Sequence, residues 1–129
     1  MWNLVLVGTG GGLGAVLRYG ISTMMKAWLP SYAGAGTLIV NVIGSLAIGY
    51  VLGASYTSKG VTEPTRLFFV IGVLGGLTTF SSLTHETVVM SSVPGAGVTT
   101  GLVHLTANVL LGLAAVWFGA YIARPISVV

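Results

Sequence analysis

Long apolar stretches alternate with short polar breaks along most of this chain. Four apolar windows run over residues 3–25, 36–55, 65–90 and 99–122, and the breaks between them contain proline, serine and glycine. A bilayer core about 30 Å thick needs about 20 predominantly apolar residues per helix. The pattern therefore predicts an all-α membrane protein with four transmembrane helices, forming a single domain over residues 1–129.

Composition supports this interpretation. Of the 129 residues, 54% are hydrophobic and only 5% are charged, whereas soluble domains are roughly a quarter charged. The lipid bilayer is therefore an expected partner. A net charge of +3 is too small for a nucleic-acid surface, so no nucleic-acid partner is expected. The absence of cysteine excludes disulfides and thiolate metal sites.

The third window is longer than one straight span requires, and it has two adjacent glycines in its middle, Gly75 and Gly76. These features predict a third helix that is broken within the membrane. Backbone groups freed inside a bilayer are tolerated only where they are buried in protein or line a cavity. Freed carbonyls suit Na⁺, and the following helix N-terminus suits an anion.

The positive charges beside the predicted spans are nearly balanced. Lys59, Arg66 and Arg124 fall on one side, and Lys26 falls on the other. A bias of about two charges specifies orientation weakly, so one fixed orientation and insertion both ways round remain open. Insertion both ways round would allow two inverted copies to pair about an axis in the membrane plane.

Small residues recur at a spacing of four, as in Gly10 with Gly14 and Gly49 with Gly53. This spacing lets helix backbones approach closely. Because the chain has 20 glycines, more than contacts within one four-helix subunit would need, the pattern favours a homodimer.

Polar residues at helical spacing mark one face of the second window and one face of the fourth. The two sets are Thr37, Asn41 and Ser45, and Thr100, His104 and Asn108. Such groups can simply join helices by hydrogen bonds worth ~0.6–2 kcal/mol. They can also line an ion path, and for Asn41 this second interpretation is slightly favoured.

Two charged residues fall inside apolar windows. Arg18 is either a snorkelling side chain near the interface or a buried cation that attracts anions to a vestibule. Glu86 either pairs with Arg18, caps free backbone donors, relays protons or binds a cation. The ring of Phe80 is electropositive along its edge, so it can face an anion without a permanent counter-charge. These residue types indicate ion passage without identifying the ion.

Four motifs in order resemble those of the Fluc (CrcB) family of fluoride channels over the whole chain. They are GGGLGAVLRY (residues 10–19), TLIVNVIGS (37–45), the GGLTTFSS run that begins at Gly75, and the fourth span through Asn108, Gly112 and Trp117. The resemblance implies a passive fluoride channel in the bacterial inner membrane. It also implies an antiparallel, dual-topology homodimer and a central structural Na⁺, with no organic cofactor. By motif position, the backbone carbonyls of Gly75 and Thr78 would hold the Na⁺.

The resemblance also implies roles for individual residues. Phe80 matches an aromatic whose ring edge approaches fluoride, Asn41 matches a pore asparagine, and Arg18 and Glu86 match vestibule or supporting residues. The predicted anion pathway comprises Thr37, Asn41, Phe80, Ser81, Ser82, Leu83, His104 and Asn108.

Three positions depart from the family pattern. Leu83 stands where a second phenylalanine is common, so half of the aromatic site is missing. His104 and Asn108 replace a common tyrosine and serine. Because imidazole can change charge near neutral pH, His104 leads to the hypothesis that conduction depends on pH.

Two other functions compete with the channel. A small dual-topology exporter of cationic drugs has a similar size, but such proteins depend on a carboxylate in the first span, where this chain has Arg18 instead. A structural membrane subunit would leave the hydroxyl-rich third span without a purpose. An enzyme is not expected, because no nucleophile–base pair or metal set is evident.

Overall fold

The computed structural model describes residues 1–55, 60–95 and 97–123. The helices within these ranges are α1 (Trp2–Trp28), α2 (Ala35–Ser55), α3 (Glu63–Thr65), the π-helical stretch η1 (Arg66–Leu74), α4 (Gly75–Leu77), α5 (Phe80–Ser91) and α6 (Gly97–Ile122).

Four helical stretches among the described residues are long and apolar enough to cross a membrane. They are Trp2–Trp28, Ala35–Ser55, Glu63–Ser91 and Gly97–Ile122. The prediction of an all-helical membrane protein is therefore confirmed. Lys59 and Arg124, on which the charge comparison partly depends, lie outside the described residues.

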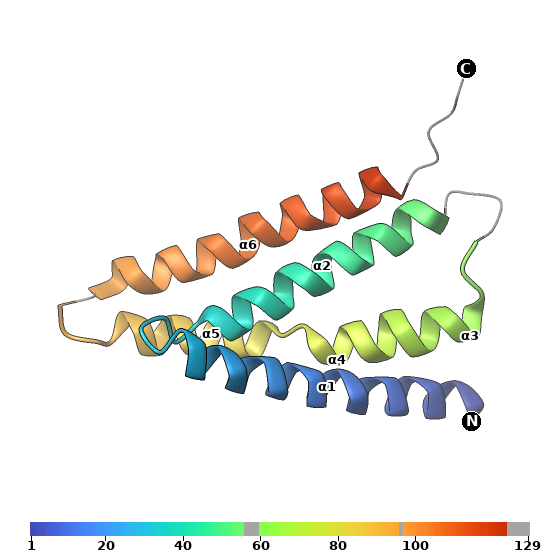
Figure 1. The fold of residues 1–129 in the computed structure, drawn as a ribbon, viewed down its shortest axis with the longest axis horizontal. Coiled ribbons are helices and arrows are strands. Elements are labelled where there is room, and N and C mark those ends of the chain that lie inside the picture. The colour runs from blue at the N-terminus through green and yellow to red at the C-terminus, as the bar shows by residue number, and fades with distance from the viewer. Residues whose placement is uncertain (56–59, 96, 124–129) are drawn as a thin grey trace, which may run out of the picture.

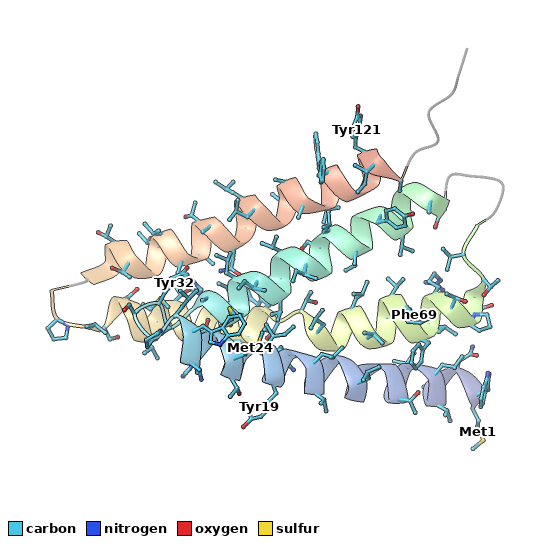
Figure 2. All side chains as sticks on the ribbon, viewed as in Figure 1. Met1, Tyr19, Met24, Tyr32, Phe69 and Tyr121 are labelled. Carbon is cyan, nitrogen blue, oxygen red and sulfur yellow. The ribbon has the colours of Figure 1, made fainter. Side chains whose placement is uncertain are left out.

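The helices form two layers. In one layer α1 packs along η1 and α4, and in the other α2 packs along α6, while α5 contacts α6 (Figure 1). The start of α1 and the end of α6 lie at the same end of the bundle. Large apolar and aromatic side chains cover the outside, and Tyr19 and Tyr121 project away from the helices (Figure 2). An apolar exterior is what a lipid environment requires.

Glycines set the closest helix contacts in both layers. A Cβ atom at Gly14 or Gly76 would collide with the backbone of η1 or α1, and a Cβ atom at Gly49 or Gly119 would collide with the backbone of α6 or α2. These glycines work within one subunit. The glycine spacing therefore does not by itself argue for a second copy.

The helix of the third span is interrupted at Thr78 and Thr79. Thr78 has φ −77° and ψ 155°, and Thr79 has φ −152° and ψ 125°, so both are extended between α4 and α5. The glycines on which the sequence prediction relied are helical instead, with Gly75 at φ −65° and ψ −35°. Gly76 is needed for another reason, because any side chain there would meet the carbonyl of Gly11 on α1.

Candidate functional site

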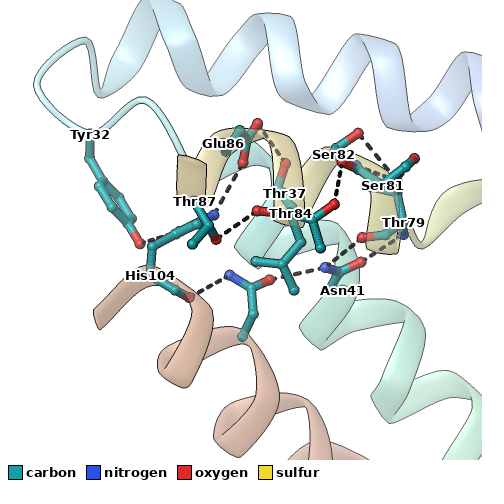
Figure 3. Close-up of polar contacts among 12 residues, drawn as sticks. Tyr32, Thr37, Asn41, Thr79, Ser81, Ser82, Thr84, Glu86, Thr87 and His104 are labelled. Atoms are coloured by element: carbon teal, nitrogen blue, oxygen red, sulfur yellow. Dashed lines mark hydrogen bonds and ion pairs between the residues drawn. The ribbon is translucent and has the colours of Figure 1, made fainter. Parts of the chain in front are cut away.

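The polar faces of α2 and α6 meet beside α5. The structure brings Thr37 and Asn41 of α2 close to His104 and Asn108 of α6 (Figure 3). These four side chains divide into two groups with different partners, one turned to the backbone of the interruption and the other to a carboxylate.

The first group binds the main chain of Thr79. Asn41 Oδ1 accepts a hydrogen bond from Thr79 N at 2.9 Å, and Asn41 Nδ2 donates to Thr79 O at 3.2 Å. The same Nδ2 donates to Asn108 Oδ1 at 3.0 Å. The amide of Asn41 therefore satisfies both peptide groups of an extended residue that has left the helical hydrogen-bond pattern.

Asn108 extends this group into α6. It is 4% exposed, and its Nδ2 donates to the carbonyl of His104 at 3.0 Å. The Thr79 hydroxyl starts α5, since Thr79 Oγ1 accepts from Ser82 N at 3.1 Å as a helix N-cap. We call Asn41, Thr79, Ser82 and Asn108 the backbone cluster.

Sequence reasoning did not single out Thr79. The available signal was local, because a threonine immediately before a helix is a preferred N-cap. The contact with Asn41 joins residues 38 positions apart, and no local pattern shows it. Ser81, predicted beside it, is exposed, and its hydroxyl lies 3.2 Å from Thr79 Oγ1.

The second group surrounds Glu86. Thr37 Oγ1 donates to Glu86 Oε1 at 2.9 Å, and His104 Nε2 lies 3.2 Å from Glu86 Oε2. His104 is 1% exposed, and among the described residues neither Nε2 nor Oε2 has a hydrogen-bond partner of good geometry, so the two atoms face each other as a close polar contact. The pairing of Glu86 with His104, rather than with Arg18, was not predicted.

Tyr32, in the turn between α1 and α2, completes this group. Its hydroxyl lies 3.2 Å from His104 Nδ1. Burial, and secondly the nearby Glu86 carboxylate, raise the pKa of Tyr32 above its usual value, so its hydroxyl is protonated at neutral pH and can donate to Nδ1. An ionised carboxylate only accepts hydrogen bonds, which favours the proton of a neutral imidazole on Nε2. We call Tyr32, Thr37, Glu86 and His104 the carboxylate cluster.

Arg18 lies half-buried beside the interruption. Its Nε donates to the carbonyl of Gly76 at 3.1 Å, and within the described part of the chain it makes no ion pair with Glu86. The guanidinium thus binds a carbonyl near the end of α4. Of the predicted roles of Arg18 and Glu86, their mutual pairing is not found.

Two cavities adjoin Thr79. One, of about 310 Å³, is polar and is lined in part by Arg18, Lys26, Thr37 and Glu86. The other is an open groove of about 410 Å³, whose lining includes Asn41, Thr79, Phe80, Leu83 and Asn108.

Phe80 and Leu83 line the groove differently. The Phe80 side chain is 74% exposed, whereas Leu83 is 4% exposed within the subunit. The Phe80 ring therefore stays largely uncovered within a single subunit, beside the amide and hydroxyl groups of the groove.

Of the two carbonyls predicted to hold Na⁺, that of Thr78 belongs to the interruption and that of Gly75 lies in α4, just before it. Thr78 N donates to Leu74 O at 3.0 Å, as in a helix, but Thr79 N donates to Asn41 rather than to Gly75 O four residues earlier. Gly75 O therefore loses its helical donor. A carbonyl released in this way is a ligand of the kind that hard cations prefer, so Gly75 O is suited to be one ligand of such an ion.

The four apolar helices and the polar groups buried between them define a multi-pass membrane protein. The family model described as CrcB-like protein, Camphor Resistance (CrcB), matches residues 5–120. The chain belongs to this family, which confirms the resemblance found in the sequence.

Similar proteins match along nearly the whole chain. A protein of Roseiflexus sp. (strain RS-1) named Fluoride-specific ion channel FluC is 42% identical over 95% of this chain and 97% of its own length. Proteins of the same name from Solibacter usitatus (strain Ellin6076) and Hyphomonas neptunium (strain ATCC 15444) are 40% and 39% identical. The match to the Solibacter protein covers 93% of this chain and 97% of that protein, and the match to the Hyphomonas protein covers 98% of both. These are names of ion channels and not of enzymes, in agreement with the prediction.

Proposed function

We propose that this protein is a passive, fluoride-selective ion channel that exports fluoride across the inner membrane of a bacterial cell. The observation that carries the proposal is the near full-length similarity to proteins named fluoride-specific ion channels, at up to 42% identity among those given above. The absence of a carboxylate from α1, which carries Arg18 and Lys26 instead, disfavours the cation exporter.

The proposed anion path runs from the polar cavity, past Thr79, to the open groove. Arg18 and Lys26 give the cavity a positive field that attracts anions. Hydroxyl groups of Ser81 and Ser82 and the edge of the Phe80 ring would then replace water around a small anion. No fixed positive charge lies in the groove lining, so the anion would not be trapped there.

The proposed working unit is an antiparallel homodimer. Its support is the groove, which is open on one side of the subunit and carries the exposed Phe80 ring. A second copy would cover this ring and close the path. The interruption at Thr78 and Thr79 would then lie within the bilayer, where protein on both sides shields its backbone groups.

The carbonyls of Gly75 and Thr78 are the proposed ligands of a structural Na⁺ between the subunits. When bound, such an ion would neutralise carbonyl dipoles at the interruption and hold the two copies together. Arg18 already stabilises the neighbouring carbonyl of Gly76 at 3.1 Å. Gly76 O is thus bound by a side chain, whereas Gly75 O has lost its helical donor and can accept a cation.

Efflux from proteoliposomes tests the proposal. Vesicles containing the purified protein are loaded with fluoride or, separately, with chloride, and anion release is followed with ion-selective electrodes. Rapid fluoride release with negligible chloride release is expected. Replacement of the exposed ring by Phe80→Leu should lower fluoride efflux while crosslinking still detects the dimer. Release of neither anion by the native chain would sink the proposal.

Leu83 provides a second measurement on the same vesicles. Leu83→Phe would place a second ring on the groove, and we expect faster fluoride efflux than in the native chain. Because Leu83 is 4% exposed, the larger ring also overpacks the subunit by about 1–3 kcal/mol. Leu83→Met is the control, since it changes the side chain without adding a ring. Equal efflux from both variants would remove the ring-edge explanation.

A further inference from the structure

The side chain of Asn41 has no hydrogen-bond donor left over for an anion. Its two amide protons point to Thr79 O and Asn108 Oδ1, and its oxygen accepts from Thr79 N. A primary amide has two donors and an acceptor oxygen, so both donors are already used. A direct role in anion coordination would require at least one of these contacts to break.

We propose that Asn41 is a backbone clamp, and that Asn108 is the positioning residue that holds the clamp in register. Asn41 replaces the helical partners that Thr79 loses when it becomes extended. Asn108 fixes the direction of the Asn41 amide and is itself anchored to the carbonyl of His104 at 3.0 Å. The two amides thus form an amide brace from α6, through α2, to the interruption between α4 and α5.

The brace explains the position of the interruption better than the glycines do. Gly75 and Gly76 are helical or packed against α1, whereas Thr79 is extended at the point where Asn41 reaches it. On the same face of α2, Gly44 leaves room for the neighbouring residue, since a Cβ atom there would collide with the methyl group of Thr78. Helix α2 therefore holds the interruption by one polar and one steric contact.

The brace also has a consequence for ion binding, which rests on the proposed function. By taking the Thr79 N–H, Asn41 leaves Gly75 O without its helical donor. The clamp is then the group that makes a cation ligand available. The existence of the clamp, in contrast, can be tested without any fluoride measurement.

Hydrogen exchange of the Thr79 amide in the full-length protein, reconstituted in nanodiscs, is the direct test. Asn41→Asp keeps the acceptor for Thr79 N, whereas Asn41→Leu removes it. Loss of one hydrogen bond of ordinary strength corresponds to roughly fivefold to tenfold faster exchange. We expect this change in Asn41→Leu and near-native exchange in Asn41→Asp. Ser55→Ala removes a hydroxyl elsewhere on α2 that donates to Val51 O at 2.8 Å, and it is the matched control.

Asn108 is tested in the same way and separately from Asn41. Asn108→Asp keeps an acceptor for Asn41 Nδ2, while Asn108→Leu does not, so only Asn108→Leu should accelerate exchange at Thr79, by a few-fold. Its effect should disappear in the Asn41→Leu background, because residues of one network are not additive. If Asn41→Leu does not fold, the comparison of Asn108→Asp with Asn108→Leu still tests the brace.

Two outcomes would overturn the brace. Native Thr79 exchange in Asn41→Leu, or lower fluoride efflux in Asn108→Leu without a change at Thr79, would show that the amides act directly on the ion path. Absence of fluoride efflux from the native chain would instead refute the proposed function and leave the exchange result standing.

Discussion

The backbone cluster and the carboxylate cluster each take one residue from the polar face of α2 and one from that of α6, but these residues bind different kinds of partner. One helical turn separates Thr37 from Asn41 on α2, and one turn separates His104 from Asn108 on α6. Within that turn the partner changes from the Glu86 side chain to the peptide groups of Thr79.

Residue chemistry explains the difference. An amide carries a donor and an acceptor, as a peptide group does, so it can replace lost main-chain partners on both sides of a residue. The hydroxyl of Thr37 instead donates to the Glu86 carboxylate, and the imidazole of His104 faces the same carboxylate at 3.2 Å. Polar residues at helical spacing can therefore bind peptide groups on one turn of a helix and a charged side chain on the next turn.

The largest expected effect separates the two clusters. Asn41→Leu leaves the part-buried N–H and C=O of Thr79 without their partner. Fully buried groups would cost about 1–3 kcal/mol each, and partial exposure lowers this cost, so we expect a loss of about 2–4 kcal/mol in unfolding free energy. Glu86→Gln keeps an acceptor for Thr37 and should cost less than about 1 kcal/mol. Denaturant titration in detergent compares the two. An equal loss in both variants would erase the distinction between the clusters.

The next effect concerns the buried imidazole. His104→Phe leaves Glu86 Oε2 and the Tyr32 hydroxyl without their partner, which should cost about 1–3 kcal/mol. His104→Tyr keeps a hydroxyl and should cost less in the same titration. The hypothesis that His104 makes efflux depend on pH stays a prediction. Flat fluoride efflux from the native chain between roughly pH 5.5 and 8 would contradict it.

A smaller effect is expected from the helix start. Thr79→Val keeps the shape of the side chain but removes the N-cap of α5, at a cost of about 1 kcal/mol. Thr84→Val is the control, because that hydroxyl donates to Ser81 O within its own helix and does not cap a helix start. Thermal unfolding should separate the two variants. A larger shift in Thr84→Val would mean that the N-cap does not hold the start of α5.

The smallest effect is expected at the edge of the carboxylate cluster. Tyr32→Phe removes one hydrogen bond, worth about 0.5–1.5 kcal/mol. Because the pKa of Tyr32 is raised by burial and by Glu86, the fold favours the neutral hydroxyl. This contribution is complete below the usual tyrosine pKa of about 10 and is lost as pH rises through the raised value. Unfolding free energies measured from neutral to alkaline pH should show this loss in the native chain and not in Tyr32→Phe.

Much of the fold was predictable because it depends on local composition. Apolar length gives helices that span a bilayer, and a spacing of four gives a common helix face. For the same reason Thr37 with Asn41, and His104 with Asn108, were recognised as polar faces. Family membership followed from motifs distributed along the whole chain.

The residues at which the third span is interrupted could not be predicted from the sequence. Two adjacent glycines suggested the wrong residues, because a glycine can serve either a bend or a close helix contact, and the sequence does not distinguish these uses. The role of Gly76 depends on Gly11 of another helix. The role of Thr79 depends on Asn41, 38 residues away.

The sequence by itself determined the class of protein, its four apolar helices and its stock of polar groups. Only the tertiary structure decided which peptide group the Asn41 amide binds and which side chain Glu86 faces. The physical reason is that helix formation and membrane partition depend on residues close in sequence. Hydrogen-bond partners inside the bundle, in contrast, are chosen by how distant helices pack.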